Sequence, residues 1–198
     1  MKRTYWIFVA ALLVALIGGT LASRWRDGTP EAGGATAATV DPAGGADPLQ
    51  AFLIERPQEP VQAEPFTAVA VNGASPRLQD YAGKYILLNF WATWCGPCKQ
   101  ELPELQALYE SLKEQNFVVL AVSMSETEEK VAHFLEDTGF TFPVLVDVDG
   151  SVSELYGVNS IPLTYLIDTD GRIEARALGP REWNDPALQA YFRRMSAQ

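Results

Sequence analysis

Cysteine and histidine are scarce in this sequence of 198 residues. It contains two cysteines, Cys95 and Cys98, and a single histidine, His133. A disulfide between the two cysteines closes almost no chain, and since cross-link stabilisation grows with the closed loop, this pair would add little to folding. Zinc normally takes four ligands, which two thiols and one remote histidine do not supply, so no metal is expected. The cysteine pair therefore indicates redox chemistry.

Basic residues are also in the minority. The chain has 15 Lys and Arg against 25 Asp and Glu, which gives a net charge of −10. A surface with this excess of negative charge repels phosphate backbones. We therefore expect no nucleic-acid partner, and nothing in the composition indicates a cofactor.

Long uncharged apolar stretches are limited to one near the start of the chain. Residues 5–21 form a run of 17 residues without a charge, which as a helix would reach roughly 26 Å, slightly less than a hydrocarbon core of about 30 Å. Residues 1–22 are predicted to be a membrane anchor. A cleaved secretory signal is the alternative, because Thr20, Leu21 and Ala22 weakly resemble a cleavage site. With either leader, the rest of the chain is expected in the periplasm or otherwise outside the cytoplasmic membrane.

Residues 23–64 are predicted to be a flexible linker. Of the 22 residues from 27 to 48, 14 are Ala, Gly or Pro, a composition that cannot pack a core. A short docked turn at Phe52, Leu53 and Ile54 is the one feature of order expected there. The folded domain is expected over residues 65–198, which is long enough to bury a substantial core.

Hydrophobic spacing predicts an α/β domain. The run 86–91 is typical of a strand buried on both faces, and the apolar residues from 102 to 112 recur at helical spacing. Further predicted elements are strands at 117–122, 142–146, 164–167 and 172–178 and helices at 126–137 and 183–195. The strand–helix–strand crossover implies parallel pairing, and Asp170-Gly171 marks a hairpin turn. A mixed central sheet with helices on both faces is expected.

Cys95 and Cys98 stand where the first strand gives way to the helix. The amino end of a helix has unpaired N–H groups and the positive end of the peptide dipole, which both favour an anion. Cys95 at that position is predicted to be a stabilised thiolate, which is the attacking form of a thiol. Cys98, one turn further on, can then attack the resulting mixed disulfide and release the partner.

The residues around the cysteines carry a family resemblance. Residues 90–99 read FWATWCGPCK, and this segment resembles the thioredoxin active site. Within that superfamily the chain is most similar to the membrane-anchored TlpA/ResA-like thiol-disulfide oxidoreductases, because of its apolar start, an added helix–strand segment over 126–146 and the run from 99 to 103. The resemblance covers roughly residues 65–198. It implies a thioredoxin-like fold and substrate contacts at Trp94, Gly96 and Pro97.

The resemblance extends to two prolines. Pro103 matches the proline that kinks the active-site helix of the family. Ile161 and Pro162 match its cis-proline loop, which lies against the cysteines, and a cis X-Pro bond is uncommon enough to be a structural device. In the family, the backbone of the residue before that proline pairs with the partner's chain. Ile161 and Pro162 are therefore predicted to bind substrate.

A departure from thioredoxin concerns proton transfer. Thioredoxin has a buried aspartate where this chain has Asn89, whereas ResA-like members have a glutamate at the position of Glu101. Glu101 follows Cys98 by three residues and so lies on the same helical face. We predict that Glu101 handles the proton of Cys98. A solvated glutamate on the helix surface is the alternative.

The expected function is reduction of disulfides in exported proteins by the Cys95/Cys98 dithiol. The resemblance implies that apocytochrome c is among the targets, reduced before haem attachment, and that a membrane thiol electron donor restores the dithiol. A thiol peroxidase is one alternative, although the peroxiredoxin signature asks for proline and threonine where this chain has Leu88 and Ala92. A copper-binding module is the other, and it would favour a wider cysteine spacing.

Overall fold

The computed structural model describes residues 47–59 and 61–197. These residues fall within one compact unit of the chain, Asp41–Gln198. The membrane anchor or signal expected at residues 1–22 lies outside the described residues. Within the described ranges, none of the helices combines the length and apolar character needed to cross a membrane.

The central sheet has seven strands, in the order β1-β7-β6-β3-β4-β5-β2. Its middle is a parallel set of three strands, β3 (Tyr85–Trp91), β4 (Phe117–Met124) and β5 (Val144–Asp147). Every residue of β3 and β5 is buried, as is all of β4 except its last residue. Continuous apolar runs form such strands because both faces of the sheet are covered. The strands predicted at 86–91, 117–122 and 142–146 are confirmed to within two residues.

The other half of the sheet is antiparallel. Strand β6 (Leu163–Ile167) pairs with β3, and β7 (Arg172–Leu178) pairs with β6 through the predicted Asp-Gly hairpin. Gly171 in that turn takes a positive φ of 79°, which glycine adopts without the usual steric cost. Two short strands complete the edges, β1 (Val61–Gln62) beside β7 and β2 (Val69–Ala70) beside β5.

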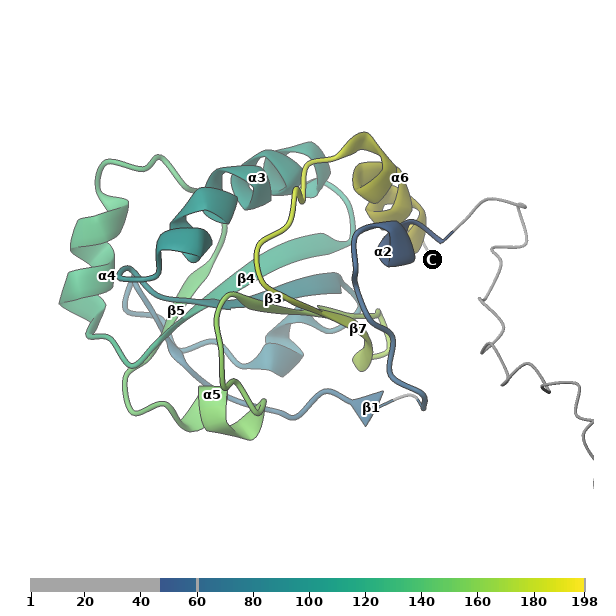
Figure 1. Ribbon diagram of the computed structural model, residues 1–198. Coiled ribbons are helices and arrows are strands. Elements are labelled where there is room, and N and C mark those ends of the chain that lie inside the picture. The colour runs from purple at the N-terminus through teal and green to yellow at the C-terminus, as the bar shows by residue number, and fades with distance from the viewer. Residues whose placement is uncertain (1–46, 60, 198) are drawn as a thin grey trace, which may run out of the picture. The chain divides into compact units, whose positions relative to one another are not determined.

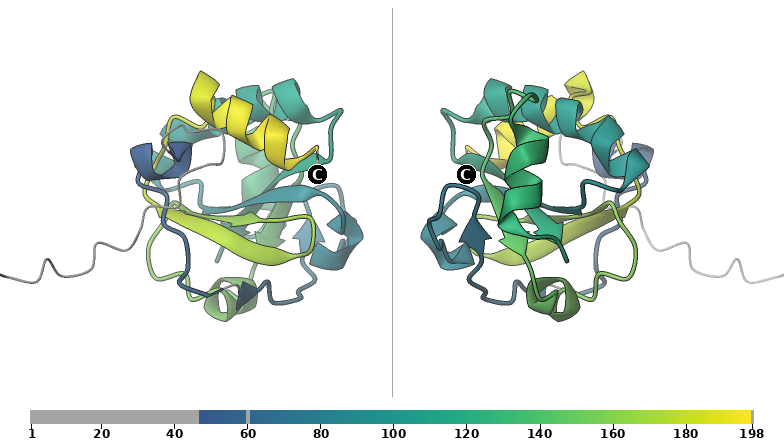
Figure 2. Two further views of the ribbon diagram at one scale, coloured as in Figure 1. Left: turned by 90° about the vertical axis from the view of Figure 1, so that its right-hand side faces the viewer. Right: turned by 90° about the vertical axis from the view of Figure 1, so that its left-hand side faces the viewer.

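Helices cover both faces of the sheet (Figures 1 and 2). One face packs against α3 (Gly96–Leu112), α4 (Glu128–Leu135) and α6 (Pro186–Met195), and the other against the 3-10 turn η1 (Leu78–Tyr81) and α5 (Ser151–Leu155). The core accordingly consists of two apolar clusters, one on each side. The mixed sheet with two covered faces confirms the thioredoxin-like architecture, including the added segment that contains α4 and β5.

The folded part begins earlier than residue 65. Residues 47–56, here called the docked segment, include helix α2 (Pro48–Ala51), whose Leu49 is fully buried in the core cluster that contains α6. Asp47 caps this helix by accepting the Leu49 N–H at 3.0 Å. The backbone of Glu55 pairs with Arg176 of β7. The linker expected over 23–64 was therefore wrong for residues 47–56 and 61–64, where buried apolar residues and sheet pairing outweigh the proline-rich composition.

Candidate functional site

The cysteine pair lies at the amino end of α3, a few residues after the end of β3. Cys95 is the N-cap residue of α3, and its Sγ lies 3.2 Å from the backbone nitrogen of Cys98. The two cysteines form a disulfide with an S–S distance of 2.04 Å. Pro97 occupies the first turn of the helix, where its missing N–H leaves no bond unmade. A thiolate at Cys95 would face the unpaired N–H groups of this helix end.

The disulfide has an accessible rim and a closed interior. Trp94 is 62% exposed, and Gly96 and Pro97 are exposed beside it. Cys95 is 5% exposed, whereas Cys98 is fully buried. Cys95 is therefore the more accessible of the two cysteines. This suits Cys95 as the attacking cysteine and Cys98 as the resolving one.

The predicted cis-proline loop lies against the cysteines. The Ile161–Pro162 bond is cis, and the carbonyl oxygen of Ile161 lies 3.9 Å from Cys95 Sγ. The oxygen of Pro162 accepts the Gly179 N–H at 2.8 Å, which joins the loop to the end of β7. Ile161 is half-buried and Pro162 is buried. The structure thus brings together residues that are 66 positions apart in the sequence.

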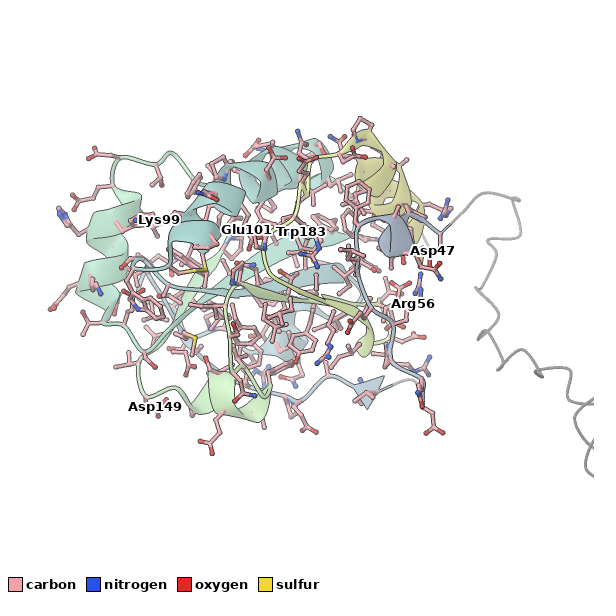
Figure 3. The ribbon with its side chains drawn as sticks, viewed as in Figure 1. Asp47, Arg56, Lys99, Glu101, Asp149 and Trp183 are labelled. Atoms are coloured by element: carbon pink, nitrogen blue, oxygen red, sulfur yellow. A yellow bond between two sulfur atoms is a disulfide. The ribbon has the colours of Figure 1, made fainter. Side chains whose placement is uncertain are left out.

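Glu101 is buried one turn further along α3, with 2% of its surface exposed. The alternative of a solvated surface glutamate is therefore wrong. Its Oε2 accepts hydrogen bonds from Trp183 Nε1 at 3.1 Å and from the Arg181 N–H at 3.2 Å. Figure 3 shows Glu101 and Trp183 close together on the side of the sheet that α3 covers. Burial raises the pKa of Glu101 to about 7, although these donors and the charge of Arg181 partly oppose the rise.

Asn89 joins Glu101 to the sheet. Its Nδ2 donates to Glu101 Oε1 at 2.8 Å and to Thr164 Oγ1 at 3.0 Å. The asparagine is fully buried, and its Oδ1 has no hydrogen-bond partner among the described residues. A neutral amide at this place supports the Glu101 carboxylate with a donor and adds no second charge.

Glu126 was not predicted as a site residue, because the helix predicted over 126–137 includes it. The helix begins at Glu128 instead, and Glu126 is buried before it, with 4% of its surface exposed. Its carboxylate accepts from the backbone N–H and the hydroxyl of Thr93, at 2.7 and 2.5 Å, and from Ser123 Oγ at 2.8 Å. Burial raises its pKa, but the hydrogen bonds from Lys130, Thr93 and Ser123 lower it by more, so the pKa lies below its usual value. Glu126 thereby holds the loop that leads to Cys95.

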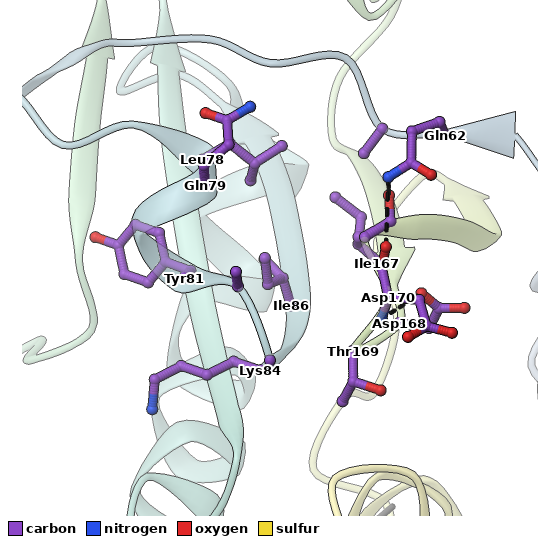
Figure 4. Close-up of a pocket in the computed structure, with 14 residues that line it drawn as sticks. Gln62, Leu78, Gln79, Tyr81, Lys84, Ile86, Ile167, Asp168, Thr169 and Asp170 are labelled. Atoms are coloured by element: carbon purple, nitrogen blue, oxygen red, sulfur yellow. Dashed lines mark hydrogen bonds between the residues drawn. The ribbon is translucent and has the colours of Figure 1, made fainter.

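A pocket of about 220 Å³ lies at the far end of β3 from the cysteines. It is lined by residues that include Ile86 at the start of β3, Ile167 at the end of β6, and the hairpin at 168–171. Gln62 also lines this pocket, and its Nε2 donates to the Gly171 oxygen at 2.7 Å (Figure 4). None of its lining residues belongs to the cysteine site, so the chemistry is assigned to the amino end of α3 and not to this pocket.

The sequence matches the AhpC/TSA family over residues 61–176, more than half of the chain. It is 40% identical over 120 residues to the thiol-disulfide oxidoreductase ResA of Geobacillus thermodenitrificans (strain NG80-2). This alignment covers 54% of this chain and 69% of the relative. It is 33% identical over 142 residues to ResA of Bacillus thuringiensis (strain Al Hakam), which covers 72% of this chain and 81% of the relative.

Solved structures give the same result. The thioredoxin domain of a thiol-disulfide oxidoreductase from Bacteroides vulgatus matches with a TM-score of 0.60 and 27% identity, over 68% of this chain and 95% of that one. StoA from Bacillus subtilis matches with a TM-score of 0.56 and 25% identity, over 64% of this chain and 96% of that one. The chain therefore belongs to the AhpC/TSA family, and it is a thiol-disulfide oxidoreductase with a thioredoxin-like fold, related to the ResA proteins.

Proposed function

We propose that this oxidoreductase works as a reductant, passing two electrons from the Cys95/Cys98 dithiol to disulfides of exported proteins. The observation that carries the proposal is the unequal exposure of the two cysteines at the amino end of α3. Gly96 and Pro97 between them match thioredoxin, which is a reductant. The apolar run at residues 5–21 supports attachment to a membrane with the redox domain outside the cytoplasm.

In the proposed reaction the Cys95 thiolate attacks one sulfur of the substrate disulfide. The substrate S–S bond breaks, a Cys95–substrate disulfide forms, and the released substrate thiolate takes up a proton. Cys98, deprotonated by Glu101, then attacks Cys95 Sγ, and the second substrate thiol leaves. The enzyme ends as the Cys95–Cys98 disulfide, which is the form present in the structure. An external dithiol, proposed to be a membrane thiol donor, restores the reduced enzyme.

The surface around the cysteines supports a protein substrate. Trp94 offers a large exposed apolar contact, and Gly96 and Pro97 leave the rim low enough for a chain to approach. Ile161 lies beside Cys95 with its carbonyl oxygen 3.9 Å from the sulfur. We assign substrate binding to Trp94, Gly96, Pro97, Ile161 and Pro162. Resemblance to the ResA-like proteins supports apocytochrome c as one substrate.

The test uses the full chain with Cys98 replaced by Ser, which cannot resolve a mixed disulfide. Cys98→Ser should form a stable mixed disulfide with an oxidised peptide containing the Cys-x-x-Cys-His haem-attachment motif, detected by mass spectrometry. Cys95→Ser, the matched control, should form none. A second oxidised peptide without the histidine distinguishes haem-motif preference from general disulfide reduction. Equal trapping of both peptides would remove apocytochrome c as a preferred substrate.

The direction of electron flow is tested by redox equilibrium with glutathione. A reductant should have a potential close to that of thioredoxin, about −270 mV, whereas an oxidant would lie near about −120 mV. A value near the oxidant would contradict the proposal. For the proton step, Glu101→Gln should change the pKa of the Cys98 thiol, measured by alkylation rate against pH, because it removes a titratable carboxyl on the same helical face. An unchanged profile would remove the role of Glu101.

A further inference from the structure

Arg181 contacts two parts of the molecule that are far apart in the sequence. It lies in the loop between β7 and α6, and its side chain reaches the docked segment. Arg181 Nε donates to the Phe52 oxygen at 2.6 Å and Nη2 donates to the Leu53 oxygen at 3.0 Å. Nη1 donates to the oxygens of Gly179 and Pro180 in its own loop, at 3.1 and 2.9 Å. One guanidinium therefore satisfies four backbone carbonyls.

The Leu53 contact supports an unusual turn. Leu53 has a positive φ of 54°, which a residue with a β-carbon rarely adopts. Its side chain is 76% exposed, so packing of that side chain does not explain the conformation. Arg181 Nη2 on the Leu53 carbonyl is a contact that favours this turn, and the docked segment is held there by the loop that follows β7.

The backbone of the same arginine binds Glu101. The Arg181 N–H donates to Glu101 Oε2 at 3.2 Å, beside the donor from Trp183. Three residues along α3, Glu104 Oε2 accepts the Asn184 N–H at 3.2 Å. The loop 181–184 is thus attached to α3 by two carboxylates, and Arg181 alone among these contacts also reaches the docked segment.

We propose that Arg181 is a positioning residue for the redox reaction, which couples docking of residues 47–56 to the placement of hydrogen-bond donors on Glu101. The inference rests on the proposed proton role of Glu101. The side chain fixes the loop by binding Phe52 and Leu53, and the fixed loop aims the Arg181 and Trp183 donors at the carboxylate. Loosening the segment therefore changes how readily Glu101 holds a proton.

The groups that face Glu101 define the expected direction. Asn89 on β3 and Trp183 are neutral donors, and Glu104 is the carboxylate one turn further along α3. Arg181 supplies both a backbone donor and a positive charge, and both effects lower the pKa of Glu101 against the rise caused by burial. Removing the guanidinium should therefore favour the protonated carboxyl. An increase of one unit from a pKa of about 7 would reduce the carboxylate fraction at pH 7 from about a half to about a tenth.

The chain offers a matched control in Arg176. Arg176 pairs with Glu55 of the docked segment through Nη2 at 3.3 Å, in an exposed ion pair. It thus binds the same segment, but among the described residues it makes no hydrogen bond or ion pair with Glu101 or with the loop 181–184. Arg176→Gln removes only this exposed ion pair, because the two backbone hydrogen bonds between residues 55 and 176 remain, at 2.8 and 2.7 Å. The segment therefore stays docked, and no donor or charge next to the carboxyl is lost.

The experiment follows the Glu101 carboxyl directly in the full-length oxidised protein, by ¹³C NMR of labelled glutamate between about pH 5 and about pH 9. Glu101→Gln identifies its resonance. Arg181→Met should move the titration midpoint to higher pH, and Arg181→Lys, which keeps the charge but cannot bind four carbonyls, should move it less. Arg176→Gln should leave the midpoint in place. If Arg181→Met fails to fold, Arg181→Lys carries the test.

An unchanged midpoint in the Arg181 variants would overturn the inference, as would an equal shift in Arg176→Gln. This result is separable from failure of the proposed proton role. If Glu101→Gln leaves the Cys98 alkylation profile unchanged while Arg181→Met still moves the carboxyl titration, the coupling stands and the proton role of Glu101 falls. If Glu101→Gln changes the alkylation profile while the Arg181 variants leave the carboxyl titration unchanged, the proton role of Glu101 stands and the coupling through Arg181 falls.

Discussion

Glu101 and Glu126 are two buried carboxyls on either side of the active-site segment, and their protons behave in opposite ways. Both side chains are almost inaccessible, with exposed fractions of 2% and 4%. Burial raises the pKa of Glu101 to about 7, whereas the pKa of Glu126 lies below its usual value. A small exposed fraction therefore does not by itself decide the protonation state of either residue.

The two carboxyls differ in their hydrogen-bond and ion-pair partners, as well as in how strongly burial acts on them. Glu101 accepts hydrogen bonds from Asn89, Trp183 and a backbone N–H. The guanidinium of Arg181 forms no ion pair with it but binds carbonyl oxygens of the docked segment. Glu126 has a direct ion pair with Lys130 at 2.7 Å in addition to its bonds with Thr93 and Ser123. A carboxyl that titrates near neutrality suits proton transfer, and a permanently ionised one suits holding a loop.

Of the variants that test this comparison, Glu101→Gln should have the largest effect on how stability depends on pH. The unfolded chain ionises this group near its ordinary value of 4.5 and the folded chain only near 7, so stability is lost as the pH rises between those values. The free energy of unfolding of the wild type should fall by about 3 kcal/mol from this group alone. The Gln variant should lack that fall, measured by urea denaturation of the oxidised protein. Glu104→Gln, on the same helix, should keep it.

Glu126→Gln should show the opposite pH window. Its folded pKa is lowered, so its stabilisation is present above the ordinary value and is lost as the pH falls through the folded pKa. At neutral pH the variant should be less stable by about 1 to 3 kcal/mol, because buried donors of Thr93 and Ser123 lose a charged acceptor. The difference from wild type should shrink in acid. A constant difference over the whole pH range would contradict the assignment of a lowered pKa.

Residues close to the motif were predictable from sequence because local rules govern them. The strand–helix junction places Cys95 at a helix end, and helical spacing puts Glu101 on the same face as Cys98, whatever the rest of the chain does. Glu126 was not predicted because it lies next to a run of helix-forming residues. The signal that could have indicated it is its position two residues after the end of a buried strand. Nothing in that local pattern indicates that its carboxylate binds Thr93, which is 33 residues away.

The start of the folded part was unpredictable for a related reason. Proline- and alanine-rich composition argues for a linker, and Leu49 and Ile54 alone are too few to indicate a core. Their burial depends on partners more than 100 residues away, because Glu55 pairs with Arg176 and Arg56 binds Glu174. Arg181 likewise meets Phe52 only after the sheet has formed. Contacts of this range leave no periodic pattern in the sequence.

Lys130→Met has the smallest expected effect and shows which donors keep Glu126 ionised. The lysine is 54% exposed, and its ion pair is of the i,i+4 type on the surface side of the carboxylate, so stability should fall by no more than about 1 kcal/mol. The loss should be smaller in high salt, because exposed charge interactions are screened. Lys113→Met, which removes an exposed pair with Glu110 on α3, is the matched control and should change stability still less. If Lys130→Met instead costs as much as Glu126→Gln, the ammonium rather than Thr93 and Ser123 holds the carboxylate, and the loop before Cys95 depends on a surface charge.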